Sequence, residues 1–142
     1  PENVISEAKN YLQILDKQGD LIQEQLLSEL IYEGEIHRLL KKNTLIYKKR
    51  RDYAFDCLKH HFNDSIQIKK PSGGLAIWIE FTPSISLVQL AEQVSKLDVF
   101  LPKTLLYQDK NTCAIRFGFG HLNEEEIEIV VSRLKQAYNS IK

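Results

Sequence analysis

Methionine is absent from the 142-residue sequence, and tryptophan occurs only once. Without a methionine the chain has no initiator residue, which we expect of a segment from a longer protein. Cysteine is scarce as well. Cys57 and Cys113 lack Cys-x-x-Cys spacing, so the sequence predicts neither a disulfide framework nor a zinc knuckle. This cysteine usage is typical of a reducing, cytoplasmic setting.

Excess charge of one sign and long apolar runs are also missing. Lys+Arg and Asp+Glu number 19 each, so the zero net charge gives no general attraction to nucleic acid or an anionic membrane. No apolar run approaches the roughly 18 residues of a membrane span. The opening Pro1-Glu2-Asn3 does not resemble a signal peptide. We therefore expect no membrane partner, and a hydrophobic content of 43% suffices for one domain with a core.

Hydrophobic periodicity predicts the order of the elements. Helical spacing indicates helices at 3–16, 20–33 and 35–62, the second opening at Asp20 and stopping at Gly34. Alternation predicts strands at 66–68, 75–81, 99–101 and 112–119. Two further helices are expected after the caps Ser86 and Asn123. Three helices followed by β-β-α-β-β-α predict an α/β (α+β) fold, a small sheet covered by helices on one side.

Two groups of residues invite a binding interpretation that the sequence does not favour. The cationic run within 38–51 spreads around its helix, as a solvated face does, rather than forming a nucleic-acid stripe. His60 and His61 project about 100° apart on a helix, a poor geometry for one metal. His37 and His121 are isolated, so we expect no metal ligands. A Cys-His nucleophile pair stays open, although nothing singles out either cysteine.

Arg116 is the candidate binding residue. Apolar residues occupy the odd positions of 112–119, which places Arg116 on the opposite face beside the small Ala114 and Gly118. Small neighbours leave space above the guanidinium, whose planar fork can bind a carboxylate through two parallel hydrogen bonds. The residues alone leave open whether Arg116 binds a ligand, faces solvent or pairs with an acidic side chain.

Several motifs, taken in order, resemble those of class I/II aminotransferases, fold-type-I proteins that use pyridoxal 5'-phosphate (PLP). The segment 71–78, Pro-Ser-Gly-Gly leading to Trp78, is similar to their P-x-G-G-x-x-x-W strand. Residues 114–120 are similar to their I-R-L-G-F-A strand, and 122–127 to the acidic L-x-x-E-E-I helix that follows. Upstream, Gly34 and Y-K-K-R-R-D at 47–52 resemble the long helix between the two domains. The combined order covers nearly all of the chain.

This resemblance implies a division of labour within a longer protein. Residues 1–34 would pack on a large domain outside this sequence, and 35–142 would form the small domain with 35–62 as interdomain helix. Arg116 would pair with the substrate α-carboxylate, and the intact protein would carry PLP. Pro1-Glu2 matches the point just after the family's cofactor lysine, and Ser95-Lys96, at the end of a helix, is no substitute. We therefore expect no catalytic or cofactor-binding residue here, no PLP bound to this chain alone and no transamination by it.

The sequence departs from the family's pattern at two places. Residues 102–106 read Pro-Lys-Thr-Leu-Leu where the family often has P-G-S-x-F, and Leu39 replaces a histidine common in the regulator branch. These departures put the wall of the substrate pocket in doubt.

Two kinds of parent protein fit the resemblance. One is a GntR/MocR-type transcriptional regulator, in which a winged-helix DNA-binding domain precedes an aminotransferase-like effector domain. The other is a free-standing aminotransferase, so enzymatic activity of the parent stays open. Residues 22–27 before Gly34 favour the regulator. Its expected partners are DNA, an amino acid or amine, and a second copy in a homodimer. In this chain alone, helices 3–16 and 20–33 would lack the large domain and expose apolar faces, so we expect the chain to self-associate by exchanging these helices between copies. A ligand-free interaction module is the third hypothesis.

Overall fold

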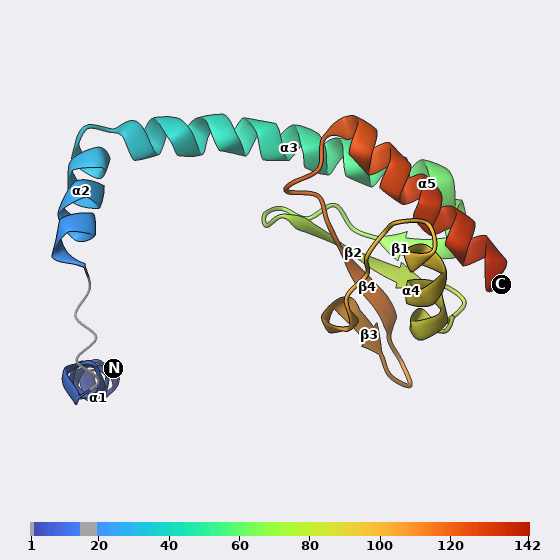
Figure 1. The fold of residues 1–142 in the computed structure, drawn as a ribbon, viewed down its shortest axis with the longest axis horizontal. Coiled ribbons are helices and arrows are strands. Elements are labelled where there is room, and N and C mark those ends of the chain that lie inside the picture. Colours follow the sequence, from blue (N-terminus) through green and yellow to red (C-terminus); the bar gives the residue numbers. More distant parts are fainter. Residues whose placement is uncertain (1, 15–19) are drawn as a thin grey trace. The chain divides into compact units, whose positions relative to one another are not determined.

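A computed structural model describes residues 2–14 and 20–142 of the chain (Figure 1). The chain divides into two compact units, Pro1–Asn43 and Thr44–Lys142. The boundary lies inside the long helix α3 (Glu35–Phe62), and the domain division expected at residue 34 stays a prediction. Within the described residues, no helix combines the length and apolarity needed to cross a bilayer.

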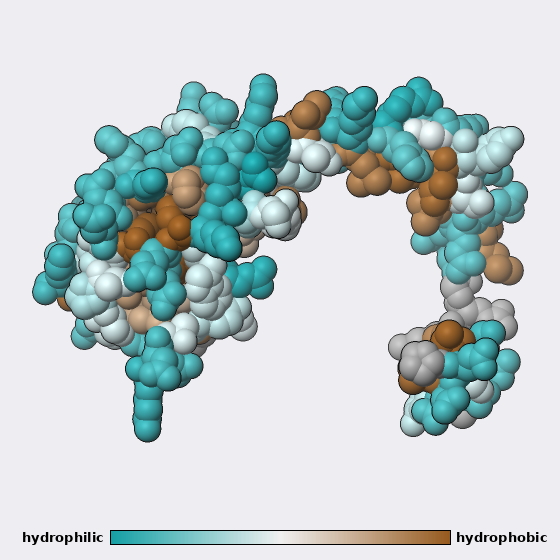
Figure 2. Space-filling model, turned by 180° about the vertical axis from the view of Figure 1, so that it is seen from behind, coloured by the Kyte–Doolittle hydropathy of each residue, from teal (hydrophilic) through white to brown (hydrophobic). Residues whose placement is uncertain are grey.

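The first unit is helical, as predicted. Helix α1 spans Glu2–Ile14 and α2 spans Leu21–Tyr32, and residues 15 and 16 of the predicted first helix lie outside the described residues. The Asp20 carboxylate caps α2 by accepting hydrogen bonds from the Ile22 and Gln23 amides, at 3.0 and 3.3 Å. Gly34, at φ 78°, separates α2 from α3 in a conformation that glycine adopts without strain. Hydrophobic residues reach the surface of this unit, and α2 buries none of its own (Figure 2).

The second unit is an antiparallel four-stranded sheet with helices on one side, which confirms the expected fold class. The strands are β1 (Ile66–Ile68), β2 (Ala76–Phe81), β3 (Leu106–Gln108) and β4 (Cys113–Gly118), and their order is β1-β2-β4-β3. Helix α4 (Leu87–Ser95) begins at Ser86, whose hydroxyl accepts from the Gln89 amide, and α5 (Glu124–Ser140) begins with a capping box between Asn123 and Glu126. Short 3₁₀ turns lie at Asn63–Ser65 and Lys103–Leu105.

The core forms where the sheet meets the second half of α3, α4 and α5. Ile77, Ile79 and Phe81 of β2 point into it, as do Ile115 and Phe117 of β4. The helices contribute a matching apolar stripe, in which Leu58, Phe62, Leu87, Leu90, Val94, Ile127, Val131, Leu134 and Tyr138 are buried. Burial of this apolar area is the main favourable term that holds the helices on this one face.

The strand predicted at Val99–Leu101 is wrong. Those residues form an irregular segment in which Val99 and Leu101 pack on the core, and the third strand lies further along, at Leu106–Gln108. Leu106 pairs with Ile115 and Tyr107 with Ala114. A short apolar segment can bury its side chains in the core without forming a strand. Pairing with the edge of β4 therefore determines which segment becomes the third strand.

Two arginines of the cationic run do not follow the solvated-face interpretation. Arg50 donates a hydrogen bond to the Gly120 carbonyl, just after β4, and Arg51 donates to the Pro71 carbonyl at 3.1 Å, in the β1–β2 turn. Both side chains are half-buried, whereas the lysines of the run are exposed. These bonds attach α3 to the ends of β2 and β4, the strands that carry the candidate site.

Asp52 supports the Arg51 contact and generates a prediction. Its carboxylate lies 2.7 Å from the Arg51 guanidinium and 3.3 Å from the Lys70 amine. The hydrogen bond from Arg51, with a smaller contribution from Lys70, lowers the Asp52 pKa from its ordinary 3.8. A lowered folded-state pKa contributes stability that is present above the unfolded pKa and lost as the pH falls through the folded value.

Replacing Asp52 by Asn should therefore lower the melting temperature at about pH 7, and the difference from the wild type should shrink as the pH falls below about 4. Thermal melts followed by circular dichroism over a pH series measure this. The control is Asp56→Asn, which removes an exposed carboxylate from the same helix. If the melting temperatures of Asp52→Asn and the wild type differ as much near pH 2.5 as near pH 7, the Asp52 carboxylate does not stabilise the fold through these contacts.

Candidate functional site

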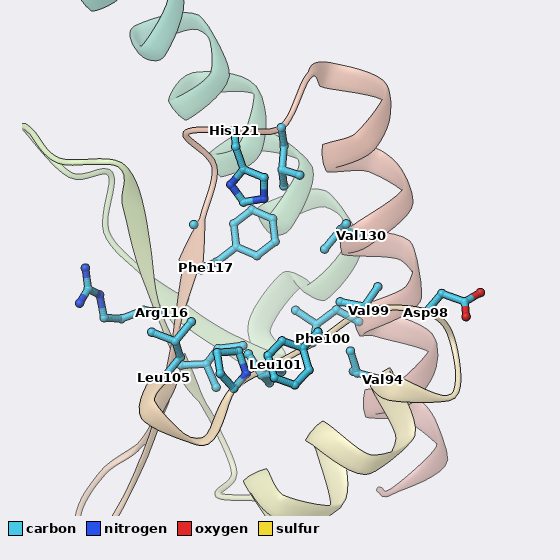
Figure 3. A pocket seen from close by; sticks show the side chains of 15 residues that line it. Val94, Asp98, Val99, Phe100, Leu101, Leu105, Arg116, Phe117, His121 and Val130 are labelled. Atoms are coloured by element: carbon cyan, nitrogen blue, oxygen red, sulfur yellow. The ribbon is translucent and has the colours of Figure 1, made fainter.

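Arg116 lies on the face of the sheet opposite the helices, where the alternation in β4 predicts it. Ile115 and Phe117 on either side of it are buried, whereas Arg116 is exposed. Figure 3 shows its side chain pointing away from Phe117 and from the helices. The structure therefore places Arg116 on the face of the sheet that the sequence predicts.

Two aromatic side chains share this face with Arg116. Trp78 of β2 is the direct register partner of Arg116, so their side chains are neighbours on one face. The Trp78 ring contacts the Tyr107 ring of β3, with centroids 4.7 Å apart. Trp78 is 41% exposed and Tyr107 is half-buried. The aromatic pair therefore forms an apolar wall beside a cation.

The small neighbours of Arg116 differ in exposure. Gly118 is exposed, as expected, and a Cβ added there would meet nothing within 4 Å. Ala114 is fully buried, although it belongs to the open face. It pairs in register with Glu80 on one side and Tyr107 on the other. The open space beside the guanidinium consequently lies toward Gly118 rather than toward Ala114.

The guanidinium of Arg116 has no hydrogen bond or ion pair with any residue in the described ranges 2–14 and 20–142. The side chain of Arg38 instead pairs with Glu35, and those of Arg50 and Arg51 with backbone carbonyls or Asp52. A guanidinium presents five N–H donors and stays protonated in proteins. Arg116 thus offers an unused bidentate donor to an incoming carboxylate or phosphate.

A cavity of about 490 Å³ lies on the helix side of β4 (Figure 3). Its lining is largely apolar and includes the irregular segment after α4, with Val99, Phe100 and Leu101 labelled in the figure. Pro102 and Leu105, in the segment that departs from the family's P-G-S-x-F turn, also line it. Arg116 and Gly118 of β4 also line this cavity, although Figure 3 shows the Arg116 side chain pointing away from its apolar residues.

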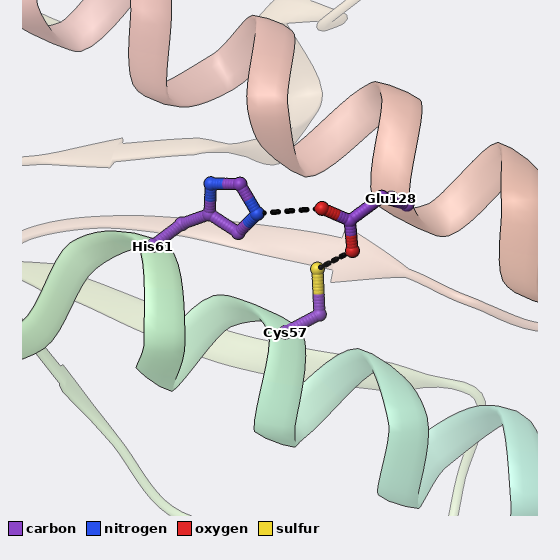
Figure 4. A group of neighbouring side chains, drawn as sticks. All are labelled: Cys57, His61 and Glu128. Carbon is purple, nitrogen blue, oxygen red and sulfur yellow. Dashed lines mark hydrogen bonds and ion pairs between the residues drawn. The ribbon is translucent and has the colours of Figure 1, made fainter.

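A second polar cluster lies between α3 and α5, and sequence reasoning missed it (Figure 4). The Cys57 thiol donates a hydrogen bond to Glu128 at 3.1 Å, and the His61 Nε2 lies 2.7 Å from the other carboxylate oxygen. The Tyr53 hydroxyl donates to Glu128 at 3.4 Å. The available signal was the four-residue spacing of Cys57 and His61, which places both on one face of a helix. His60, the other member of the histidine pair, makes none of these hydrogen bonds, and its ring meets the His61 ring edge-on with centroids 5.6 Å apart.

The electrostatics of this cluster follow from its contacts. Burial, together with the hydrogen bond to Glu128, raises the pKa of the Cys57 thiol to about 12. The hydrogen bonds from Cys57 and His61 lower the pKa of Glu128. Burial and the nearby Glu128 charge raise the pKa of Tyr53. Cys57 is therefore a protonated thiol rather than an activated nucleophile, which does not favour a Cys-His nucleophile at this position.

The lysines offer no anchor for a carbonyl cofactor among the side chains that the structure describes. Lys135 is half-buried, and its amine lies 5.0 Å from the ring centroids of Phe62 and Tyr138. The other described lysine side chains are exposed, Lys96 among them. An imine-forming lysine needs a desolvated site that lowers its pKa. The described residues therefore do not fit the anchoring of PLP.

No protein-family model matches the chain. In sequence it is similar to two HTH-type transcriptional regulators, YdfD of Bacillus subtilis and NorG of Staphylococcus aureus. Identity to YdfD is 22% over 90% of the chain and 27% of that regulator, and identity to NorG is 23% over 89% of the chain and 29% of that regulator. The chain thus spans less than a third of the length of the curated relatives it matches.

In structure the chain is similar to aminotransferases. Over 98% of its length it superposes on 36% of the α-aminoadipate aminotransferase LysN of Thermus thermophilus, with a TM-score of 0.81 and 19% identity. Over 79% of its length it superposes on 28% of a multiple substrate aminotransferase of Thermococcus profundus, with a TM-score of 0.69 and 22% identity. The chain therefore has an aminotransferase-like small-domain fold, and its relatives in sequence are HTH-type transcriptional regulators.

Proposed function

We propose that the chain is the small domain of an aminotransferase-like effector domain in a GntR/MocR-type transcriptional regulator, where Arg116 binds the carboxylate of an amino acid effector. The observation that carries the proposal is the position of Arg116. It lies exposed on the open sheet face beside Trp78, and its guanidinium has no partner in the described part of the chain. The regulator relatives and the aminotransferase-like fold support the wider assignment.

The open face can bind and orient a carboxylate. Two N–H groups of the Arg116 fork can donate to the two carboxylate oxygens, a geometry that a lysine cannot reproduce. The rings of Trp78 and Tyr107 provide an apolar surface beside that contact. Because β4 is held between β2 and β3, the backbone under Arg116 is fixed before a ligand arrives. Arg116 thus selects ligands that carry a carboxylate and sets their orientation.

PLP belongs to the intact protein in this proposal and is held by residues outside this chain. When bound, it supplies a carbonyl that captures amines and an electron sink for the bonds next to the captured nitrogen. The chain contributes the effector's carboxylate partner and no cofactor anchor, because the described lysines do not fit that role. Its partners are the large PLP-binding domain, an amino acid or amine, and DNA through an upstream winged-helix domain, in the cytoplasm.

A free-standing aminotransferase is the second candidate, favoured by the superposition on LysN over 98% of the chain. The two candidates place the same Arg116 beside the same ligand group. They differ in what precedes the aminotransferase-like region in the gene. A basic winged-helix domain upstream supports the regulator, and its absence supports the enzyme.

The role of Arg116 predicts a loss of selectivity for carboxylates. In the full-length, PLP-loaded protein, Arg116→Ala should weaken amino acid binding about 10- to 100-fold, since a hydrogen-bonded pair with a charged group is worth about 1.5–3 kcal/mol. Spectral titration with a panel of L-amino acids, and with the amines that lack their carboxylate, measures the effect. The amines should bind the variant and the wild type equally.

Arg133→Ala is the matched control, because Arg133 lies on α5, on the helix side of the sheet. Arg116→Lys should restore the charge but only part of the affinity, because the bidentate geometry is lost. If Arg116→Ala binds the L-amino acids as tightly as the wild type does, and still binds them more tightly than the amines, Arg116 does not have the proposed role.

The missing cofactor anchor predicts the outcome of a PLP titration with this chain. The absorbance should remain that of free PLP, because an imine needs an amine whose pKa is lowered by its site. Borohydride reduction and peptide mapping should find only scattered labelling of exposed lysines. A saturable imine band of one equivalent, fixed to a single lysine, would contradict the prediction.

The exposed apolar side chains of α2 predict self-association. Ile22, Leu26 and Leu27 are 80%, 56% and 51% exposed, more apolar surface than a short helix leaves in water without a partner. Light scattering should show a mass that rises with concentration toward a dimer, and Leu26→Ser with Leu27→Ser should reduce it. Val88→Ser, an exposed apolar position on α4, is the control. A wild type that stays monomeric at high concentration would refute the expectation.

A further inference from the structure

Cys57, His61 and Glu128 bring three different metal-ligating groups to one point between α3 and α5 (Figure 4). The Cys57 sulfur, a ring nitrogen of His61 and a carboxylate oxygen of Glu128 all lie within 4.8 Å of one another. Two of the ligands come from one helical face and the third from the neighbouring helix. The proposed effector role of Arg116 does not use this cluster.

We propose that Cys57, His61 and Glu128 form a binding site for a single Zn²⁺-like transition-metal ion that bridges α3 and α5. Cysteine and histidine one helical turn apart form a two-ligand clamp, because residues i and i+4 are stacked on the same face. Glu128 closes the third side from α5. Solvent supplies a fourth ligand, since the Glu128 side chain is 48% exposed and the His61 side chain 22% exposed.

The distances fit a tetrahedral ion after small side-chain movements. With metal bonds of about 2.3 Å to sulfur and about 2.0–2.2 Å to nitrogen and oxygen, tetrahedral ligands lie about 3.3–3.7 Å apart. In the structure Cys57 Sγ is 3.1 Å and His61 Nε2 is 2.7 Å from the nearest Glu128 oxygen. Each of these two contacts must therefore lengthen by less than about 1 Å, and the Cys57 sulfur and the His61 nitrogen, which lie within 4.8 Å of each other, must reach the same range of about 3.3–3.7 Å.

The ligand set selects the class of ion. A thiolate with an imidazole and one carboxylate suits Zn²⁺, Co²⁺ or Ni²⁺, whereas Mg²⁺ and Ca²⁺ prefer shells of oxygen ligands. The surroundings also favour a cation, because Glu128 carries a negative charge and the Tyr53 hydroxyl lies 3.4 Å from it. Binding would replace the thiol proton of Cys57 by the metal and release that proton to solvent, since the thiolate is the form that ligates a metal.

The consequence is a cross-link between α3 and α5. Such a cross-link stabilises the folded chain by mass action, since the unfolded chain does not hold the three ligands together. The competing interpretation is a hydrogen-bonded cluster that binds no metal. In that case the thiol and the imidazole serve only as hydrogen-bonding partners of the Glu128 carboxylate.

Titration of the metal-free, reduced chain distinguishes a metal site from a hydrogen-bonded cluster that binds no metal. Calorimetry with Zn²⁺ should show one equivalent bound and a raised melting temperature, and Co²⁺ should give the near-ultraviolet absorbance of a thiolate–cobalt bond. Cys57→Ser, His61→Ala and Glu128→Gln should each weaken Zn²⁺ binding at least about tenfold. Mg²⁺ should produce no response. Cys113→Ser removes the other cysteine and His60→Ala the neighbouring exposed histidine, and both should bind Zn²⁺ as the wild type does.

Wild-type chain that takes up no Zn²⁺ would overturn the proposal, as would Zn²⁺ binding that His61→Ala leaves unchanged. Circular dichroism checks the fold of each variant. If Cys57→Ser fails to fold, His61→Ala decides, because that side chain is partly exposed. Loss of binding in His60→Ala with retention in His61→Ala would place the metal elsewhere and equally overturn the assignment.

Discussion

One-sided burial of a four-stranded sheet is the constraint on which both the core and the candidate site depend. The helices cover a single face, so every second residue of β2 and β4 must be apolar and point toward them. Ile115 and Phe117 occupy two such positions, and the pleat leaves Arg116 no position but the open face. A slip of one residue in β4 would place the guanidinium among apolar side chains and expose two large hydrophobic ones. The stability of the core therefore fixes the orientation of the candidate binding residue.

The alternation of side chains between the two faces of a strand also explains which parts of the fold the sequence predicts well. Strands β2 and β4 carry large apolar residues at every second position, and α5 has a capping box at Asn123 and Glu126, so their positions follow from local signals. Strand β3 has only three residues. At that length the apolar run Val99–Leu101 is the stronger local signal, whereas Leu106–Gln108 ends in a polar residue, and pairing with Ile115 decides in favour of the second segment. Pairing is a tertiary property, so a single sequence does not contain the answer.

In the candidate sites, too, some features follow from local sequence patterns and others depend on tertiary contacts. The exposed face of Arg116 follows from alternation, whereas the Trp78–Tyr107 contact and the burial of Ala114 depend on which strand flanks β4. Cys57 and His61 are visible in the sequence as a pair one helical turn apart. Their third partner, Glu128, is 71 and 67 residues further along the chain and reaches them only because α5 packs against α3. Arg50 and Arg51 show the same limit, since their backbone acceptors lie in distant loops.

The free energy available on the open face suggests what kind of role Arg116 can have. A bidentate pair with a carboxylate is worth about 1.5–3 kcal/mol net in a protein, whereas micromolar binding requires about 8 kcal/mol. The aromatic wall of Trp78 and Tyr107 contacts a ligand from one side only, so it adds less than an enclosed pocket does. If the open face binds an amino acid as proposed, most of the affinity must therefore come from groups outside this face. In the role proposed for it, Arg116 would therefore contribute selectivity for the carboxylate and the orientation of the ligand rather than most of the affinity.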